Sequence, residues 1–245
     1  MKIFSSSGPQ SLNTVNETPK TDKPQLLLIG ASGGWMMSTA WLEEFSRIDA
    51  YDIDPLAGFL FHLNHGQALK KKGIQLRFHT LDAIHHMEQV LRAHPSAIVW
   101  FDNVLGQHRI RLRNAELASA QLKLIHLRLK NRVWGSVHDL YSGPSCLPSP
   151  LKAGEEPAPA SIVRLDNNPE STARVVFNSN EMSLEQARQR YLQQLGATPI
   201  GGAWLDHETS NLFPLKTPVS WVGWAFKPGY YHCLEMGWII PSLKS

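Results

Sequence analysis

The alternation of apolar and polar segments predicts a chain of strands and helices. Leu26–Ile29 is too uniformly apolar for a half-exposed strand and predicts a buried one. A helix is expected to follow from about Trp35 to Phe45. The apolar runs that predict the later strands are Ile48–Ile53, Ile74–Phe78, Ala97–Phe101 and Val133–Val137.

Polar residues between these runs carry helix start and stop signals. Asp54 has the properties of an N-cap, with Pro55 at the first helical position. The helix should run to the lysines at 70–72, whose charges suit a helix C-terminus, and Gly73 should end it. Two more helices are expected, from Asp82 to about Ala93 and from about Asn114 to Lys130.

Five strands that alternate with helices indicate an α/β fold with a parallel sheet covered on both faces. Right-handed crossovers would make this sheet doubly wound. Near the C-terminus, Val219–Phe226 and Tyr231–Ile240 flank a Pro-Gly turn signal and predict an antiparallel hairpin. The expected fold is therefore a doubly wound, mostly parallel seven-stranded sheet with helices on both faces and a C-terminal antiparallel hairpin.

The domain organisation follows from changes in composition. Residues 1–24 are polar, with little to bury, and are expected to form a flexible N-terminal arm. Residues 25–245 are expected to form one domain, with a variable insertion at about 142–180 that begins as a loop rich in Pro, Gly and Ser at 142–160. A helix should start at Ser183 as its N-cap and run to about Leu195.

Charge and cysteine content narrow the class of protein. The net charge of +3 makes nucleic acid a possible partner but does not favour it, because a dedicated binder usually carries a strongly basic stripe. Two cysteines cannot build a disulfide framework, and they fit a reducing compartment. No apolar run in the sequence is as long as a signal peptide or a membrane span requires. We expect a soluble, cytoplasmic protein that does not bind a membrane.

The stretch LLLIGASGGW (26–35) has two chemical interpretations. Gly30, Ser32 and Gly34 match the G-x-S-x-G nucleophile elbow of serine hydrolases, with Asp206 and then His207 or His232 as downstream partners. Alternatively, a strand, a glycine-rich turn and a helix start form a nucleotide cradle. The elbow would follow the first strand with no oxyanion segment before it, and this position favours the cradle.

The residues after the turn refine this interpretation. A nucleotide fold needs an acid about 20 residues further on, at the end of the second strand, to hold ribose hydroxyls, and Asp52 is there. NAD is disfavoured because Ser32 and Trp35 replace the second and third glycines of its fingerprint. The G-K-[ST] of a P-loop is absent from the sequence.

From Leu26 to Asp139 the chain resembles the class I S-adenosylmethionine-dependent methyltransferases, which have a Rossmann-like fold. The turn at 30–34 stands where that family has its G-x-G-x-G loop, and Asp52 in AYDIDP stands at its ribose-binding acid. Asp82 in HTLDA matches its adenine-binding acid. The segment WFDNVLGQ (100–107) lies where the family lines the methyl-transfer site.

The resemblance implies an enzyme that transfers a methyl group from the cofactor S-adenosylmethionine to a small molecule or a protein side chain. The residues it implies for cofactor binding are Gly30, Ala31, Ser32, Gly34, Asp52, Ile53, Leu81, Asp82, Ala83, Asp102 and Asn103. His138 and Asp139 end the fifth predicted strand at the same crevice, so we expect them to be catalytic, with His138 as a general base.

Alternative functions stay open at this point. An RNA methyltransferase is one, although the N/D-P-P-[YF] motif for base amino groups is missing from the sequence. A non-catalytic cofactor-binding protein is another, because Leu28 and Ser32 depart from the family pattern. A serine hydrolase that uses Ser32 is the third. The histidine spacings do not complete a ligand set, so no metal is expected. The methyl acceptor and the oligomeric state are not encoded in a motif.

Overall fold

The computed structural model describes residues 23–112, 114–147, 157–168, 172–197, 203–209 and 211–241. Most of the predicted N-terminal arm lies outside these ranges. Contacts divide the chain into two compact units, which we treat separately. The described part of unit 1 comprises residues 23–102, Lys123–Trp134 and Pro241. Unit 2 comprises the described residues of Asn103–Leu122 and Gly135–Ile240.

Unit 1 is built on four parallel strands in the order β3-β2-β1-β4. Their bounds are β1 Gln25–Ile29, β2 Arg47–Asp52, β3 Gln75–Thr80 and β4 Ile98–Asp102. Leu26, Leu27 and Leu28 are fully buried, as the uniformly apolar run predicted. Because the strands are parallel, β1, β2 and β4 all end at the same edge of the sheet, with Ile29, Asp52 and Asp102 as their last residues.

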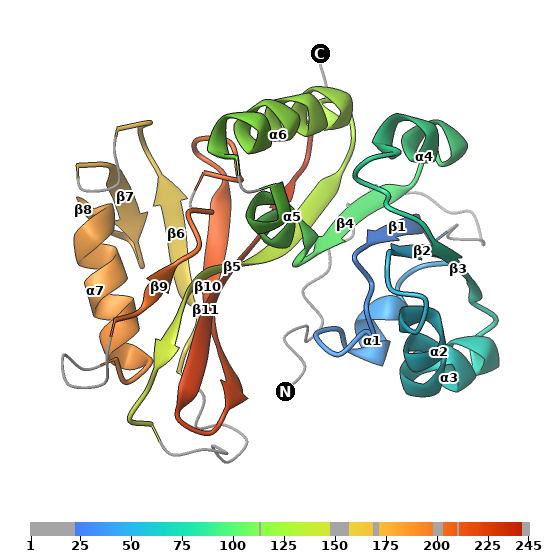
Figure 1. The fold of residues 1–245 in the computed structure, drawn as a ribbon, viewed down its shortest axis with the longest axis horizontal. Coiled ribbons are helices and arrows are strands. Elements are labelled where there is room, and N and C mark those ends of the chain that lie inside the picture. The colour runs from blue at the N-terminus through green and yellow to red at the C-terminus, as the bar shows by residue number, and fades with distance from the viewer. Residues whose placement is uncertain are drawn as a thin grey trace, which may run out of the picture. The chain divides into compact units, whose positions relative to one another are not determined.

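Short helices connect these strands, and Figure 1 shows α1, α2 and α3 on one side of the sheet and α4 on the other. Their bounds are α1 Thr39–Leu42, α2 Ala57–Phe61, α3 Gln67–Lys71 and α4 Met87–Ala93. A π-helical turn, η1 His62–Gly66, joins α2 to α3. The first helix is shorter than predicted, because Ser38 rather than a residue near Trp35 caps it by accepting a hydrogen bond from the Trp41 N–H.

Unit 2 contains the remaining strands, whose order is β5-β11-β10-β6-β7-β8, with β9 paired to β5. Their bounds are β5 Trp134–Pro144, β6 Ala160–Arg164, β7 Arg174–Phe177, β8 Asn180–Ser183, β9 Leu205–Asp206, β10 Pro218–Lys227 and β11 Tyr230–Ile239. The pairs β5–β9, β6–β7, β7–β8, β6–β10 and β10–β11 are all antiparallel. The predicted C-terminal hairpin is confirmed as β10–β11.

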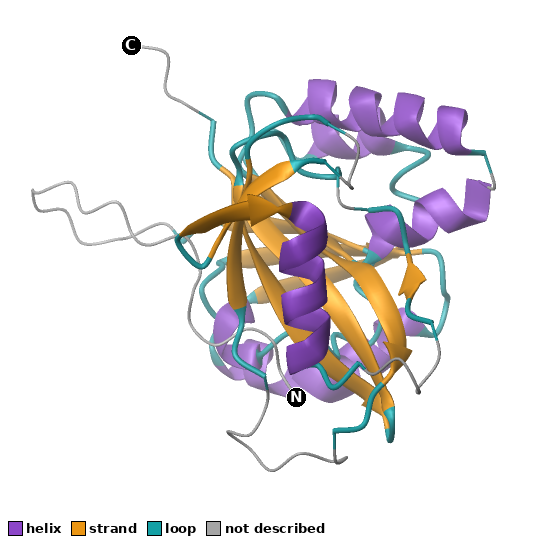
Figure 2. Ribbon diagram, turned by 90° about the vertical axis from the view of Figure 1, so that its left-hand side faces the viewer, coloured by secondary structure: helices purple, strands orange, loops and turns teal. Residues whose placement is uncertain are grey.

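Helix α7 (Leu184–Gln194) lies across the strands of unit 2 (Figure 2). Its predicted N-cap is confirmed: the Ser183 hydroxyl accepts from the Gln186 N–H, and the Gln186 side chain accepts from the Ser183 N–H. The Tyr191 hydroxyl donates to the Trp221 carbonyl at 2.9 Å and so fixes α7 to β10. Helix α5 (Val104–Leu112) was not predicted, and α6 (Ala115–Leu129) matches the long predicted helix.

The predicted fold class is wrong. The described residues contain eleven strands instead of seven, and the sheet is mixed, with mostly antiparallel pairs in the C-terminal half. The sequence of 142–180 is rich in turn-forming residues, which hid the short strands β6 and β7 and the end of β5. Strands this short contain too few residues to show a clear alternation of apolar and polar positions. No helix within the described residues is both long and apolar enough to cross a membrane.

Candidate functional site

The glycine-rich turn at 30–34 leaves β1 with a backbone that favours glycine. Gly30 and Gly34 have φ angles of 78° and 69°, and Ser32, with φ 47°, adopts the same left-handed region at a cost that glycine would avoid. A Cβ on Gly34 would also lie 2.7 Å from the His65 ring. The turn is therefore closely packed, and both its conformation and its neighbours require glycine at 34.

Most backbone N–H groups of this turn already donate hydrogen bonds within unit 1. Those groups belong to Gly30, Ala31, Ser32 and Gly34. The Tyr51 carbonyl accepts the first two at 2.8 and 3.3 Å, and Asp52 Oδ2 accepts the Ser32 N–H at 2.8 Å. A phosphate cradle needs such N–H groups to point at its ligand. The turn therefore has few free N–H groups to offer a phosphate.

Asp52 connects the ends of β1 and β2. Its Oδ2 accepts from Ser32, as described, and its Oδ1 accepts from the Asp54 N–H at 2.9 Å. A carboxylate has about four acceptor positions, so two remain for a ligand. The next residue, Ile53, has half of its surface exposed at the same edge. Holding the turn is a role of Asp52 that the sequence did not reveal, and its contact to ribose hydroxyls stays a prediction.

Asp102 is the last residue of β4 and is only 7% exposed. Its Oδ1 is buried and has no hydrogen-bond partner among the described residues. Burial, and secondarily the negative charge of Asp52, raises the pKa of Asp102 to about 8. At neutral pH this carboxyl is therefore mostly protonated, and a cationic ligand at this edge would favour its ionised form.

The predicted adenine-binding segment lies at the end of β3. The Leu81 N–H donates to the Asp52 carbonyl at 2.8 Å, which ties this segment to β2. Asp82 Oδ1 accepts from the His85 N–H at 3.0 Å, so this side chain caps the turn that leads to α4. Ala83 is buried. The structure brings Leu81 next to Asp52, but it gives Asp82 a capping role as its clearest function.

Sequence reasoning missed two residues of the π-helical turn η1 that hold the glycine-rich turn in place. Asn64 Nδ2 donates to the Gly33 carbonyl at 2.6 Å, and His65 Nε2 lies 2.9 Å from the Gly34 carbonyl. Because a carbonyl only accepts, His65 Nε2 carries the proton and its Nδ1 accepts from the Thr39 hydroxyl at 2.9 Å. A π-turn has no local sequence signal, but such turns often occur at functional sites.

Asn103 and Asp139, predicted for cofactor binding and catalysis, form a polar cluster within unit 2. Asn103 Nδ2 donates to Asp139 Oδ2 at 3.0 Å, and the Asp139 N–H donates to Asn103 Oδ1 at 3.2 Å. His232 Nδ1 lies 2.7 Å from Asp139 Oδ1. Burial raises the pKa of Asp139, but the hydrogen bonds and charge of His232 and the bond from Asn103 outweigh it, so the pKa is lowered.

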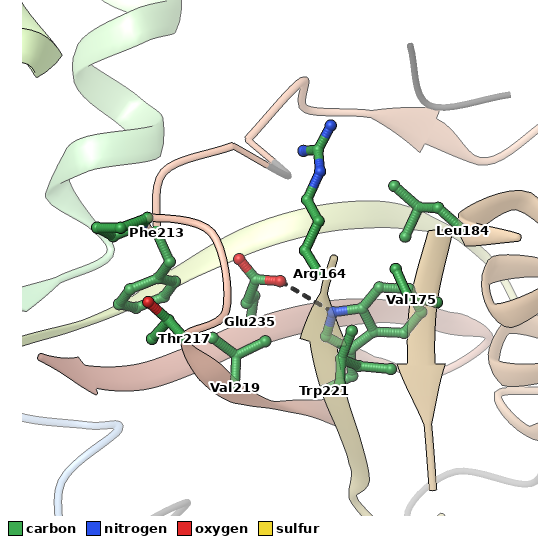
Figure 3. A pocket seen from close by; sticks show the side chains of 10 residues that line it. Arg164, Val175, Leu184, Phe213, Thr217, Val219, Trp221 and Glu235 are labelled. Carbon is green, nitrogen blue, oxygen red and sulfur yellow. Dashed lines mark hydrogen bonds between the residues drawn. The ribbon is translucent and has the colours of Figure 1, made fainter. Parts of the chain in front are cut away.

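His138 does not join this cluster, because successive residues of a strand point to opposite faces. Its side chain is fully buried, and its Nε2 lies 3.3 Å from Glu235 Oε1 on β11. Glu235 Oε2 also accepts from the Trp221 indole N–H at 3.0 Å, drawn as a dashed line in Figure 3. A general base must reach its substrate, so this location gives His138 a structural role.

A pocket beside Glu235 is lined mainly by apolar side chains. The residues labelled in Figure 3 are Arg164, Val175, Leu184, Phe213, Thr217, Val219, Trp221 and Glu235. The guanidinium of Arg164 points away from the carboxylate, and its Nε donates to the Asp166 carbonyl at 3.1 Å. The cavity volume of about 20 Å³ has room for roughly one water molecule, so this pocket is too small for a substrate.

A second polar group lies close to the Asp139 cluster. The Ser142 hydroxyl is 2.9 Å from His207 Nε2 and 3.2 Å from the Tyr230 hydroxyl. Burial lowers the pKa of His207, while the charge of Asp139 partly opposes this effect. Ser142 is almost fully buried within β5, in contrast to the exposed serine of a nucleophile elbow. We interpret this group as a polar link that joins β5, β11 and the residue after β9.

Comparison with protein-family models gave no match to this chain, and comparison with curated proteins gave none either. Among the described residues, no group of three or more His, Cys, Asp or Glu side chains is arranged to hold a metal ion.

Proposed function

We propose that this protein is an S-adenosylmethionine-dependent methyltransferase that holds its methyl donor at the edge of unit 1 where β1, β2 and β4 end. The proposal rests mainly on the buried carboxyl of Asp102, whose Oδ1 has no hydrogen-bond partner within the described residues. The negative charge of Asp52 also acts on this carboxyl and raises its pKa. Two carboxyl groups at one edge favour a ligand with positive charge.

The chemistry of the donor set fits this cofactor better than it fits a phosphorylated nucleotide. The turn has already used four N–H groups internally, which removes the usual contacts to phosphate. S-adenosylmethionine carries an ammonium group and ribose hydroxyls, which donate hydrogen bonds to carboxylates, and a sulfonium, whose positive charge a carboxylate attracts. Asp52 would accept from the ribose hydroxyls, and Asp102 would face the cationic part of the ligand.

When bound, S-adenosylmethionine supplies a methyl group that is already activated by its positive sulfur. The residues of unit 1 then have to bind, orient and keep water away, and no strong catalytic side chain is required there. Asn64 and His65 hold the turn rigid through its carbonyls, so the site exists before the ligand arrives. The acceptor is a small molecule or a protein side chain, and the two unpaired cysteines suit a cytoplasmic enzyme.

Calorimetric titration with S-adenosylmethionine and S-adenosylhomocysteine tests the proposal. Binding of both is expected, and Asp52→Ala should weaken it at least tenfold. Asp54→Ala is the matched control, because this neighbouring acid caps the next turn through the Leu56 N–H and is not assigned to the ligand. If the wild-type protein binds neither compound, or if the two variants behave alike, the proposal is wrong.

The pH dependence of binding examines the role of Asp102 separately. Binding of a cation should ionise this carboxyl and release a proton at pH 7, where it is mostly protonated. The heat measured in buffers of different ionisation enthalpy reports that proton. Asp102→Asn should abolish the release and weaken binding of S-adenosylmethionine more than binding of the uncharged-sulfur product. Equal proton release by wild type and variant would exclude Asp102 from the site.

A further inference from the structure

The polar cluster of Asn103, Asp139 and His232 in unit 2 is arranged like a catalytic acid–base pair. Asp139 on β5 and His232 on the neighbouring strand β11 lie 2.7 Å apart, and their side chains are 14% and 15% exposed. Asn103 fixes the other carboxylate oxygen from a second direction. An aspartate held on both oxygens is a rigid acceptor for the histidine ring.

The hydrogen bonds determine which nitrogen of His232 is available. An ionised carboxylate only accepts, so the Nδ1–H of His232 donates to Asp139 and the lone pair remains on Nε2. No hydrogen bond from Nε2 to another described residue is present. This arrangement, with an aspartate that orients the ring and stabilises its protonated form, is the one that makes a histidine an efficient general base.

Aromatic side chains of the β10–β11 hairpin surround this base. Trp224 is the cross-strand partner of His232, and its ring centroid lies 5.4 Å away. The rings of Phe226 and Tyr230 lie at 5.1 and 5.7 Å, and Phe226 is 55% exposed. The exposed Phe226 ring beside a partly exposed base offers a stacking surface for a flat, apolar molecule, with the half-buried Trp224 and Tyr230 rings next to it.

The neighbouring charges support the same role. The His207 ring stacks at 6.3 Å, and burial lowers its pKa, so it stays neutral near pH 7 and does not repel a protonated His232. Lys227 Nζ lies over the Tyr230 ring, 5.4 Å from its centroid. Asp139 is the charged side chain that contacts His232 directly.

We propose that His232 is the general base of a second site in unit 2, which takes planar aromatic substrates with an acidic proton. His232 Nε2 removes the proton, the electron pair of the broken bond stays on the substrate, and Asp139 stabilises the imidazolium that forms. This site does not depend on the nucleoside site of unit 1, and it works without S-adenosylmethionine.

The experiment uses 5-nitrobenzisoxazole, a flat aromatic probe that reports base strength through a colour change. The base takes the ring C–H proton while the N–O bond breaks, and its electrons produce a nitrile and a coloured phenolate, so no co-reactant is needed. The full-length protein without cofactor should form the phenolate about 10²-fold faster than free imidazole at equal concentration. His232→Gln should lose this excess, whereas the control His85→Gln, which changes an exposed histidine of unit 1, should keep it.

The pH profile separates a catalytic dyad from a structural one. The rate should follow a single ionisation in which the unprotonated base is active. In Asp139→Asn the midpoint should move to lower pH, because the carboxylate that stabilises the imidazolium is gone. Circular dichroism confirms that each variant is folded. A wild-type rate no greater than that of imidazole, equal rates for the two histidine variants, or an unmoved midpoint would each overturn the inference.

Discussion

Asp102 allows a quantitative test of the edge chemistry in unit 1 through protein stability. Its pKa rises from 3.8 in the unfolded chain to about 8 in the folded protein. Between these values the folded protein binds one more proton than the unfolded chain, so stability falls as pH rises. This contribution is fully present below about pH 4 and is lost as pH approaches 8.

The size of the effect follows from about 1.4 kcal/mol per pH unit. From pH 5 to pH 7 the wild-type protein should lose about 3 kcal/mol through this group alone. Asp102→Asn keeps the shape and cannot ionise, so its stability lacks this dependence. The difference in free energy of unfolding, variant minus wild type, should therefore rise by about 3 kcal/mol over that range in favour of the variant.

Urea denaturation of both proteins at several pH values measures this difference, and the other titrating groups cancel in it. An NMR titration of the Asp102 side-chain carboxyl gives its pKa in the folded protein, from which the same free-energy difference follows. If the difference is constant from pH 5 to pH 7, Asp102 ionises as an exposed aspartate does and the argument from burial fails. The same result would also remove the observation that carries the proposed cofactor site.

Four further substitutions test how the fold is held. Gly34→Ala should cost at least about 1–2 kcal/mol from the left-handed backbone alone, and an unchanged urea midpoint would contradict the φ of 69°. Tyr191→Phe leaves the Trp221 carbonyl without its hydroxyl donor and should cost about 1–3 kcal/mol; a loss below 0.5 kcal/mol, on the order of measurement error, would show that water replaces it. Ser183→Ala removes the cap of α7 and should cost about 1 kcal/mol, whereas Gln186→Ala, which removes the reciprocal bond, should cost less; the reverse order in thermal melts would refute this assignment.

Local patterns were enough to predict much of unit 1. The run Leu26–Ile29 gave β1 because a strand buried on both faces has to be apolar throughout. Asp52 was correctly placed at the end of β2, because strand ends can be read from where apolar residues stop. The interaction of Asp52 with Ser32 was not predictable, since it depends on how two strands 20 residues apart lie side by side.

Unit 2 was harder to predict because its contacts are long-range. Strands β6 and β7 are short, and they are held by pairing to β10 and to each other rather than by their own pattern. The Asp139–His232 pair joins residues 93 positions apart, and only the sheet order brings them together. His138 attracted attention because it stands beside Asp139, yet strand geometry turns it towards Glu235.

The π-helical turn between α2 and α3 makes the glycine-rich turn sensitive to a one-residue deletion. Such a turn corresponds to an α-helix with one inserted residue. Deleting a single residue within His62–Gly66 would restore regular winding and leave the flanking helices close to their present orientation, because five π-helical residues turn about as far as four α-helical ones. The change would be confined to the turn itself. Asn64 and His65 would then be unable to reach the carbonyls of Gly33 and Gly34 together. A one-residue gap here in a related sequence would therefore indicate a glycine-rich turn that lacks the hydrogen bonds from Asn64 and His65.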